Sequence, residues 1–315
     1  MQILELEEIK RRLEKVDIIP AIERGFVAYS SGTANIPPVG ELQLDKGEVH
    51  IKYGAIEASP YYVIKIASGF YGNPELGLPS SDGCMLAFCQ ETGQLKSILL
   101  DKGHLTDVRT AVAGAIVAKY LAPRRVSRIG IVGTGIQARA QLSYLRSVVD
   151  CREVVVWGRS HSRLDRYVSD VTEIDPDFRV ETTLDVAELQ ERCNLIVTTT
   201  PATTPLLHGP LRPGTHVTAV GSDTPEKQEL DPSILQRADR VVADSVEQCR
   251  LRGEISHALR DRRIQVDRIV ELGRIISGHA DGRTDDDQIT VADLTGVAVQ
   301  DIQIASAVIS ERALA

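Results

Sequence analysis

A glycine-rich turn between an apolar segment and a helix-forming segment constrains this chain of 315 residues more than any other feature. Residues 128–132 predict a buried strand, and residues 136–149 predict a helix. Between them, Gly133, Gly135 and Ala138 occupy the three key positions of a G-x-G-x-x-A motif. The first glycine permits a tight turn, the second lets the backbone approach a pyrophosphate, and the alanine keeps helix and strand close. In this strand–turn–helix context the motif predicts a dinucleotide-binding (Rossmann) domain.

The segment after the second expected strand, residues 153–157, indicates which dinucleotide is bound. NAD enzymes usually carry an acidic residue about 20 positions after the glycines, where it holds the ribose 2′-hydroxyl. Here Arg159, Ser160 and Arg163 stand in its place, and such side chains can bind a 2′-phosphate. We therefore expect NADP(H) to be favoured, with NAD(H) possible. The alternative is that both arginines are solvated surface residues.

Two folding patterns divide the chain. From residue 126 onward, expected strands and helices alternate, which favours a parallel sheet with helices on both faces. Before that point, residues 1–30 have helical spacing, and a helix is expected at residues 107–121. Between these helices, strand-like segments separated by short turns predict an antiparallel sheet, at residues 48–53, 61–67, 84–89 and 94–100. The tail, residues 291–315, predicts one long apolar helix. The fold class is therefore α/β, a Rossmann domain plus an α+β domain.

Composition excludes several kinds of partner. With 44 acidic and 36 basic residues the formal net charge is −8, which argues against nucleic-acid binding. No stretch reaches the roughly 18–20 apolar residues needed to cross a bilayer, and the acidic N-terminus lacks the features of a signal peptide. Five cysteines without a C-x-x-C pair favour a cytoplasmic location. No histidine pair has metal-ligand spacing, so we expect no metal.

Five sequence blocks, in this order, resemble the ornithine cyclodeaminase/mu-crystallin family: residues 64–69, 105–111, 130–142, 219–223 and 294–301. The resemblance implies a substrate-binding and dimerisation domain formed by residues 1–121 together with 290–315, and a Rossmann domain at residues 122–289. It also implies a homodimer. Members of the family move a hydride between nicotinamide and the carbon that bears an amino or imino nitrogen.

The resemblance also implies roles for individual residues. Lys65 would hold the substrate carboxylate beside the reacting carbon, Arg109 a carboxylate or coenzyme phosphate, and Asp223 would exchange a proton with the substrate nitrogen. The residues alone leave other interpretations open: a solvated Lys65, a salt bridge from Arg109 to Asp107 or another acid, and a turn role for Asp223. If the helix starts at Thr106 or Asp107, Arg109 opposes the helix dipole and needs an anion. The expected coenzyme contacts are Arg109, Gly133, Thr134, Gly135, Ile136, Gln137, Ala138, Trp157, Gly158, Arg159, Ser160, Arg163, Thr199, Thr200, Val220 and Gly221.

Two departures from the family concern the substrate. Many relatives carry an arginine near residues 37–41, and this chain has none there. Lys52 stands where ornithine cyclodeaminases carry a glutamate for the distal amino group. A hairpin through residues 59–60 would bring Lys52 beside Lys65, where it could bind a carboxylate or another distal group that is not a cation. Alternatively, Lys52 is a solvated strand lysine.

The resulting functional hypothesis is an NAD(P)H-dependent reductase of a small imino acid or ketimine, or a dehydrogenase of the matching amino acid. A cyclodeaminase with recycled NAD is the alternative. A non-catalytic dinucleotide-binding protein is the third possibility.

Overall fold

The computed structural model describes residues 1–310, in two compact units. Unit 1 consists of Met1–Arg109 with the described residues from Val297 onward, and unit 2 consists of Thr110–Gly296. The boundaries expected from the sequence lie near residues 121 and 289. The boundary between the units falls inside helix α3 (His104–Leu121), whose residues from Thr110 onward belong to unit 2. Strand β15 (Thr290–Asp293) also belongs to the sheet of unit 2, so the second boundary follows it.

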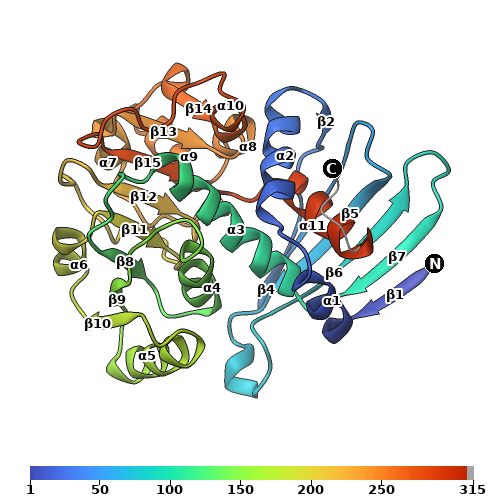
Figure 1. The fold of residues 1–315 in the computed structure, drawn as a ribbon, viewed down its shortest axis with the longest axis horizontal. Helices are drawn as coiled ribbons and strands as arrows, with labels where there is room; N and C mark the ends of the chain where they lie inside the picture. The colour runs from blue at the N-terminus through green and yellow to red at the C-terminus, as the bar shows by residue number, and fades with distance from the viewer. Residues whose placement is uncertain (311–315) are drawn as a thin grey trace. The chain divides into compact units, whose positions relative to one another are not determined.

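Unit 1 contains a seven-stranded sheet, with neighbours in the order β1-β7-β6-β5-β4-β2 and β3 paired to β4 (Figure 1). All pairs are antiparallel except β1 with β7. The strands are β1 (Gln2–Glu5), β2 (Ala34–Asn35), β3 (Gly40–Leu44), β4 (Gly47–Ile56), β5 (Tyr61–Gly69), β6 (Ser81–Cys89) and β7 (Leu95–Leu100). The antiparallel sheet expected from the turn-separated segments is therefore confirmed. The expectation of a helical N-terminus is wrong for the first strand, because β1 extends the sheet beside β7.

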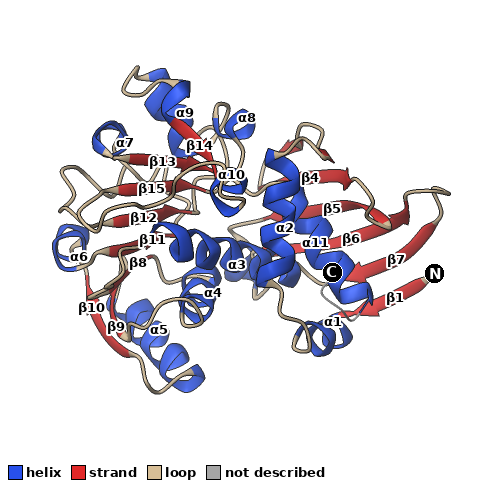
Figure 2. Ribbon diagram, turned by 45° about the horizontal axis from the view of Figure 1, so that its top comes forward, coloured by secondary structure: helices blue, strands red, loops and turns tan. Residues whose placement is uncertain are grey.

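Helix α11 (Ala298–Ser310) lies in the core of unit 1, where it contacts α1 (Leu6–Leu13), α2 (Ile19–Ser30) and the strands β4, β5 and β6 (Figure 2). Its residues are buried from one end to the other except for the last. Gly25 of α2 permits this packing, because a Cβ there would lie 3.1 Å from the carbonyl oxygen of Val299. The short 3-10 helix η1 (Asn73–Leu76) follows β5.

The two faces of this sheet differ in exposure. On β4, His50 and Lys52 are buried, whereas Ile51 and Tyr53 are 37% and 39% exposed. Ile66 on β5 is 36% exposed and pairs with Ile51. The alternation confirms that His50 and Lys52 share a face, and it leaves an apolar patch on the opposite face.

Unit 2 contains an eight-stranded, entirely parallel sheet in the order β10-β9-β8-β11-β12-β15-β13-β14. Its other strands are β8 (Ile129–Val132), β9 (Glu153–Trp157), β10 (Arg179–Thr183), β11 (Leu195–Thr198), β12 (His216–Ala219), β13 (Arg240–Ala243) and β14 (Ile269–Glu271). The helices are α4 (Ile136–Leu145), α5 (His161–Ile174), α6 (Val186–Arg192), α7 (Pro232–Arg237), α8 (Val246–Cys249), α9 (Gly253–Arg260), α10 (Leu272–Ile276) and the 3-10 helix η2 (Val266–Arg268). The chain order reverses beside β8, as in a doubly wound Rossmann fold, which confirms the fold class.

The expectation of one long helix over residues 291–315 is wrong at its start. Val291 lies in β15, which pairs with both β12 and β13 in the middle of the sheet. Gly296 then adopts a positive φ of 82° and redirects the chain, so the helix begins only at Ala298. Residues 311–315 of the expected helix lie outside the described residues. Among the described helices, none combines the length and apolarity needed to span a membrane.

Candidate functional site

The turn between β8 and α4 has the geometry that a dinucleotide phosphate requires. Gly133 has φ 124°, and a Cβ at this position would lie 2.6 Å from Thr199 Oγ1, so only glycine fits without rearrangement. Gly135, the N-cap of α4, has open space where a side chain would be, and Ala138 is fully buried. The first turn of α4, which includes Ile136 and Gln137, presents backbone N–H groups and the positive end of the helix dipole. The turn therefore fits a pyrophosphate.

Arg139, which the sequence analysis missed, braces this turn. Its guanidinium donates hydrogen bonds to the carbonyl oxygens of Thr134 (2.6 Å) and Gly135 (2.9 Å). The same group pairs with Asp170 at 2.7 Å and lies over the ring of Tyr167. Arg139 directly follows the last residue of the motif, Ala138, and therefore lies next to the turn. This position in the sequence is a signal that could have identified Arg139 as a residue that stabilises the turn.

The end of β9 and the start of α5 carry the residues expected at the adenosine ribose. Gly158 packs tightly, since a Cβ would lie 2.8 Å from Thr134 Cγ2, and Trp157 donates a hydrogen bond to the carbonyl oxygen of Leu184. Arg159 and Arg163 are both exposed on either side of Ser160, the N-cap of α5. Residues 157–163 include no carboxylate. The two arginines are therefore accessible to an anion.

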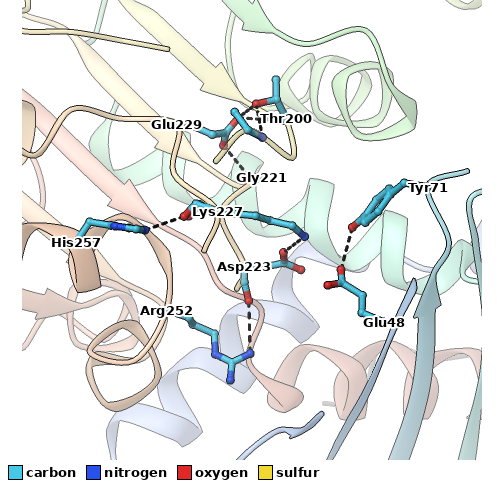
Figure 3. Close-up of polar contacts among 11 residues, drawn as sticks. Glu48, Tyr71, Thr200, Gly221, Asp223, Lys227, Glu229, Arg252 and His257 are labelled. Atoms are coloured by element: carbon cyan, nitrogen blue, oxygen red, sulfur yellow. Dashed lines mark hydrogen bonds and ion pairs between the residues drawn. The ribbon is translucent and has the colours of Figure 1, made fainter. Parts of the chain in front are cut away.

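Two loops at the carboxyl ends of β11 and β12 are joined by one buried carboxylate. Thr199 and Thr200 follow β11, and Val220 and Gly221 follow β12. Glu229, absent from the sequence-based candidates, accepts hydrogen bonds from the backbone of Thr200 (2.6 Å) and of Gly221 (2.9 Å) (Figure 3). Ligands of open α/β sheets bind beyond these strand ends.

Asp223 lies in the loop after β12, and its side chain is 36% exposed. Its Oδ1 accepts a hydrogen bond from Lys227 Nζ at 2.7 Å, and its carbonyl oxygen accepts one from Arg252 at 3.4 Å (Figure 3). Lys227 was missed by sequence reasoning, although a lysine four residues after a candidate acid is a usable signal. An ammonium group at this distance favours the ionised carboxylate, the form that accepts a proton.

Unit 1 gathers three buried basic side chains, and the buried carboxylate of Asp301 contacts two of them. Lys52 on β4 stands directly opposite Lys65 on β5 in the antiparallel register, as the hairpin hypothesis predicted. Lys65 Nζ lies 2.9 Å from the carboxylate of Asp301 on α11, and Arg109 Nε lies 3.1 Å from it. Lys52, Lys65 and Arg109 are 5%, 2% and 6% exposed, which rules out the interpretation of Lys52 and Lys65 as solvated lysines. This concentration of buried basic side chains favours binding of an anion.

Burial changes the protonation of Lys65. Desolvation is the main cause, and the charge of Arg109 adds to it, so that the pKa of Lys65 falls to about 7. Asp301 acts in the opposite direction, and Lys52 lowers the value further. Near neutral pH, Lys65 can therefore exist with or without its proton.

Arg109 does not occupy the first turn of its helix. Helix α3 begins at His104, and Asp101 accepts a hydrogen bond from the Leu105 N–H at 2.8 Å at its N-terminus, so the expected cap at Thr106 or Asp107 is wrong. The argument from the helix dipole therefore does not hold for Arg109. Its anionic partner in the structure is Asp301, and Gln300 accepts a further hydrogen bond from it at 3.2 Å.

The open parallel sheet with this phosphate turn is the coenzyme domain of nicotinamide-dependent oxidoreductases, and this is the class that the fold defines. The model of the ornithine cyclodeaminase/mu-crystallin family matches residues 1–315, and the chain belongs to this family.

Individual relatives show how widely activities vary within the family. The chain is 40% identical over 296 residues to an uncharacterized cyclodeaminase of Sinorhizobium fredii, covering 92% of this chain and 89% of the relative. Among solved structures, an archaeal alanine dehydrogenase dimer with bound NAD is 33% identical with a TM-score of 0.89, covering 98% and 95% of the two chains. The iminosuccinate reductase of Paracoccus denitrificans in complex with NAD+ is 29% identical with a TM-score of 0.86, over 98% and 95%.

Proposed function

We propose that this protein reduces the C=N bond of a small imino acid or ketimine with a reduced nicotinamide coenzyme, or oxidises the matching amino acid. The observation that carries the proposal is the group of buried basic side chains Lys52, Lys65 and Arg109, in which Lys52 lies opposite Lys65 and the other two contact Asp301. It suits the carboxylate of an imino acid, in a chain whose other unit carries a phosphate turn. The relatives named for alanine dehydrogenase and iminosuccinate reductase activity support the same reaction class.

In this proposal each side chain has a separate task. The coenzyme, when bound, supplies or accepts the hydride. Lys65 and Arg109 hold the α-carboxylate of the substrate, and Asp223 exchanges a proton with its nitrogen. A carboxylate also stabilises the positive charge that develops on this nitrogen during reduction.

A cyclodeaminase is the second candidate, because the relative from Sinorhizobium fredii bears that name. Such an enzyme recycles NAD and releases ammonia, whereas a reductase consumes the reduced coenzyme. Coenzyme absorbance and ammonia release, measured in parallel on a panel of amino and imino acids that includes ornithine, distinguish the two. A protein that binds coenzyme but turns over nothing in the panel would indicate a non-catalytic binding protein.

Lys52 provides a prediction about the substrate. A buried ammonium opposite Lys65 repels a distal ammonium group, so we expect poor activity on ornithine and lysine and better activity on substrates without a distal cation. Lys52→Glu should shift kcat/KM toward diamino acids. Lys46→Glu, which alters an exposed lysine of the same unit, should leave the preference unchanged. Efficient conversion of ornithine to proline by the unmodified protein would contradict this prediction.

The exposed Arg159 and Arg163 lead to a prediction about which coenzyme binds more tightly. We expect NADPH to bind more tightly than NADH, because Arg159 and Arg163 can pair with the 2′-phosphate. Such charge-assisted contacts contribute roughly 1.5–3 kcal/mol, or about one to two decades in Kd. In calorimetric titrations Arg159→Ala should remove most of the difference, whereas the exposed Arg166→Ala should not. Equal affinities for NADPH and NADH in the unmodified protein would refute the preference. The two solved relatives described above contain NAD.

We also propose that the protein forms a homodimer and is located in the cytoplasm. The archaeal alanine dehydrogenase is a dimer, and unit 1 exposes Ile51, Tyr53 and Ile66 on one face of its sheet. A second copy is the occupant that we propose for this face. Light scattering should give twice the 34.4 kDa of the chain, and Ile66→Asp should halve that mass.

A further inference from the structure

The buried carboxylate of Glu229 has no role in the reaction described so far. Glu229 is 0% exposed, and four donors converge on its two oxygens. Oε1 accepts from the backbone N–H (2.6 Å) and the hydroxyl (2.8 Å) of Thr200. Oε2 accepts from the hydroxyl of Thr198 (2.8 Å) and the N–H of Gly221 (2.9 Å). All four acceptor positions of the carboxylate are therefore filled.

These donors belong to two different strand ends. Thr198 closes β11, Thr200 follows it, and Gly221 follows β12. The backbones meet closely at this point, because a Cβ on Gly221 would lie 2.5 Å from the Thr200 nitrogen and 2.6 Å from Glu229 Oε2. Glu229 thus fixes the spacing of the two loops through its hydrogen bonds. Among the side chains described for this region, no other one joins these loops.

We propose that Glu229 is a positioning residue that holds Thr200 and Gly221 together as one platform for the nicotinamide half of the coenzyme. This inference rests on the proposed function, which needs a coenzyme bound beyond the carboxyl ends of these strands. The hydrogen bonds that Glu229 accepts all come from Thr198, Thr200 and Gly221 and none from the ribose end at Arg159, so binding at the ribose end provides an internal reference.

The neighbouring Glu254 of α9 supports the charged state of Glu229. Glu254 is 1% exposed and accepts hydrogen bonds from the backbone N–H groups of Glu229 (2.7 Å) and Leu230 (3.0 Å). Burial and the charge of Glu229 raise the pKa of Glu254 to about 8, and burial raises the pKa of Glu229 to about 7. A proton on Glu229 would face the four donors that converge on its oxygens, so we assign the proton to Glu254 and the charge to Glu229.

The loop itself is also anchored at its other residues. Ser222 donates a hydrogen bond to the carbonyl oxygen of Lys227, and the His257 ring contacts the same oxygen at 2.9 Å. Together with Arg252 on the carbonyl of Asp223, these contacts hold the chain from residue 222 to residue 230 in place. A change at Glu229 should therefore act on the platform and leave the rest of the loop anchored.

The test compares the whole coenzyme with its adenosine half. Kd values for NADPH and NADH, and for their adenosine halves, adenosine 2′,5′-bisphosphate and AMP, are measured by calorimetry on the unmodified protein and on Glu229→Gln. The glutamine keeps the shape but points an amide N–H₂ at two of the four donors. We expect weaker binding of the whole coenzyme by about tenfold, within the range usual for coupled sites, and an unchanged Kd for the adenosine half.

Two further variants serve as controls for this test. Thr198→Val removes one donor at constant volume and should shift the Kd of the whole coenzyme in the same direction by a smaller factor. Glu226→Gln, an exposed position in the same loop, should shift neither Kd. Thermal unfolding without coenzyme shows whether each variant is folded.

The outcomes separate the hypotheses. If Glu229→Gln and Thr198→Val bind the whole coenzyme as tightly as the unmodified protein does, Glu229 is not a positioning residue. The same conclusion follows if binding of the whole coenzyme and of its adenosine half weakens equally. If the unmodified protein binds neither the coenzyme nor its adenosine half, the proposed function fails instead.

Discussion

Replacing Asp223 by asparagine is expected to lower turnover by about 10²–10⁴-fold, the usual contribution of a general acid–base group. The substitution keeps the shape of the side chain but removes the group that accepts a proton. The Kd of the coenzyme should change little, because the contacts expected for it are at other residues. Steady-state kinetics on the best substrate of the panel, with a parallel coenzyme titration, measure both quantities.

Two variants control this experiment. Asp165→Asn changes an exposed aspartate on α5 and should leave turnover unchanged. Lys227→Met removes the ammonium group that lies 2.7 Å from Asp223 Oδ1, so it should move the acidic limb of the pH–rate profile to higher pH. Normal turnover in Asp223→Asn would show that another group carries the proton.

Replacing Asp301 by asparagine should cost about 3–5 kcal/mol of unfolding free energy, the usual effect of leaving a buried charge without its partner. Lys65 and Arg109 are both buried, and both lie within 3.1 Å of this carboxylate. Urea unfolding of the unmodified protein and the variant measures the loss. The exposed Glu75→Gln in the same unit should cost nothing measurable.

The loss should depend on pH through Lys65. In the folded protein its pKa is lowered from 10.5 to about 7, so between these values the unfolded chain binds more protons and the contribution of Lys65 to stability rises with pH. Asp301 raises the pKa of Lys65, and without it the pKa falls further. The deficit of Asp301→Asn should therefore be larger at pH 6 than at pH 8.5. An equal deficit at both values would show that Lys65 does not depend on this carboxylate for its charge.

Local patterns predicted much of the fold and the coenzyme region. The turn at Gly133 and Gly135 can be identified because strand, turn and helix are consecutive in sequence. The pairing of Lys52 with Lys65 was also predictable, since a hairpin joins their strands. The start of α3 at His104 was missed because Asp101, three residues before the helix, accepts the hydrogen bond expected of a nearer cap.

Contacts between distant segments escaped prediction. Asp301 is 236 residues from Lys65, and nothing near either residue indicates the other. The available signal was a single acidic residue in a helix that is otherwise almost free of charge. Residues 291–293 were assigned to that helix because a four-residue strand beside a long apolar run has no distinctive pattern. Glu229 was missed because its donors lie 8 to 31 residues away.

The position of β15 has a consequence for synthesis of the protein. This strand occupies the middle of the sheet in unit 2, and α11, which follows it, fills the core of unit 1. A nascent chain that lacks residues 290–310 therefore has a gap between β12 and β13 and an uncovered apolar sheet. Both units must wait for this segment to leave the ribosome, and during that interval their exposed strand edges are open to aggregation or to a chaperone.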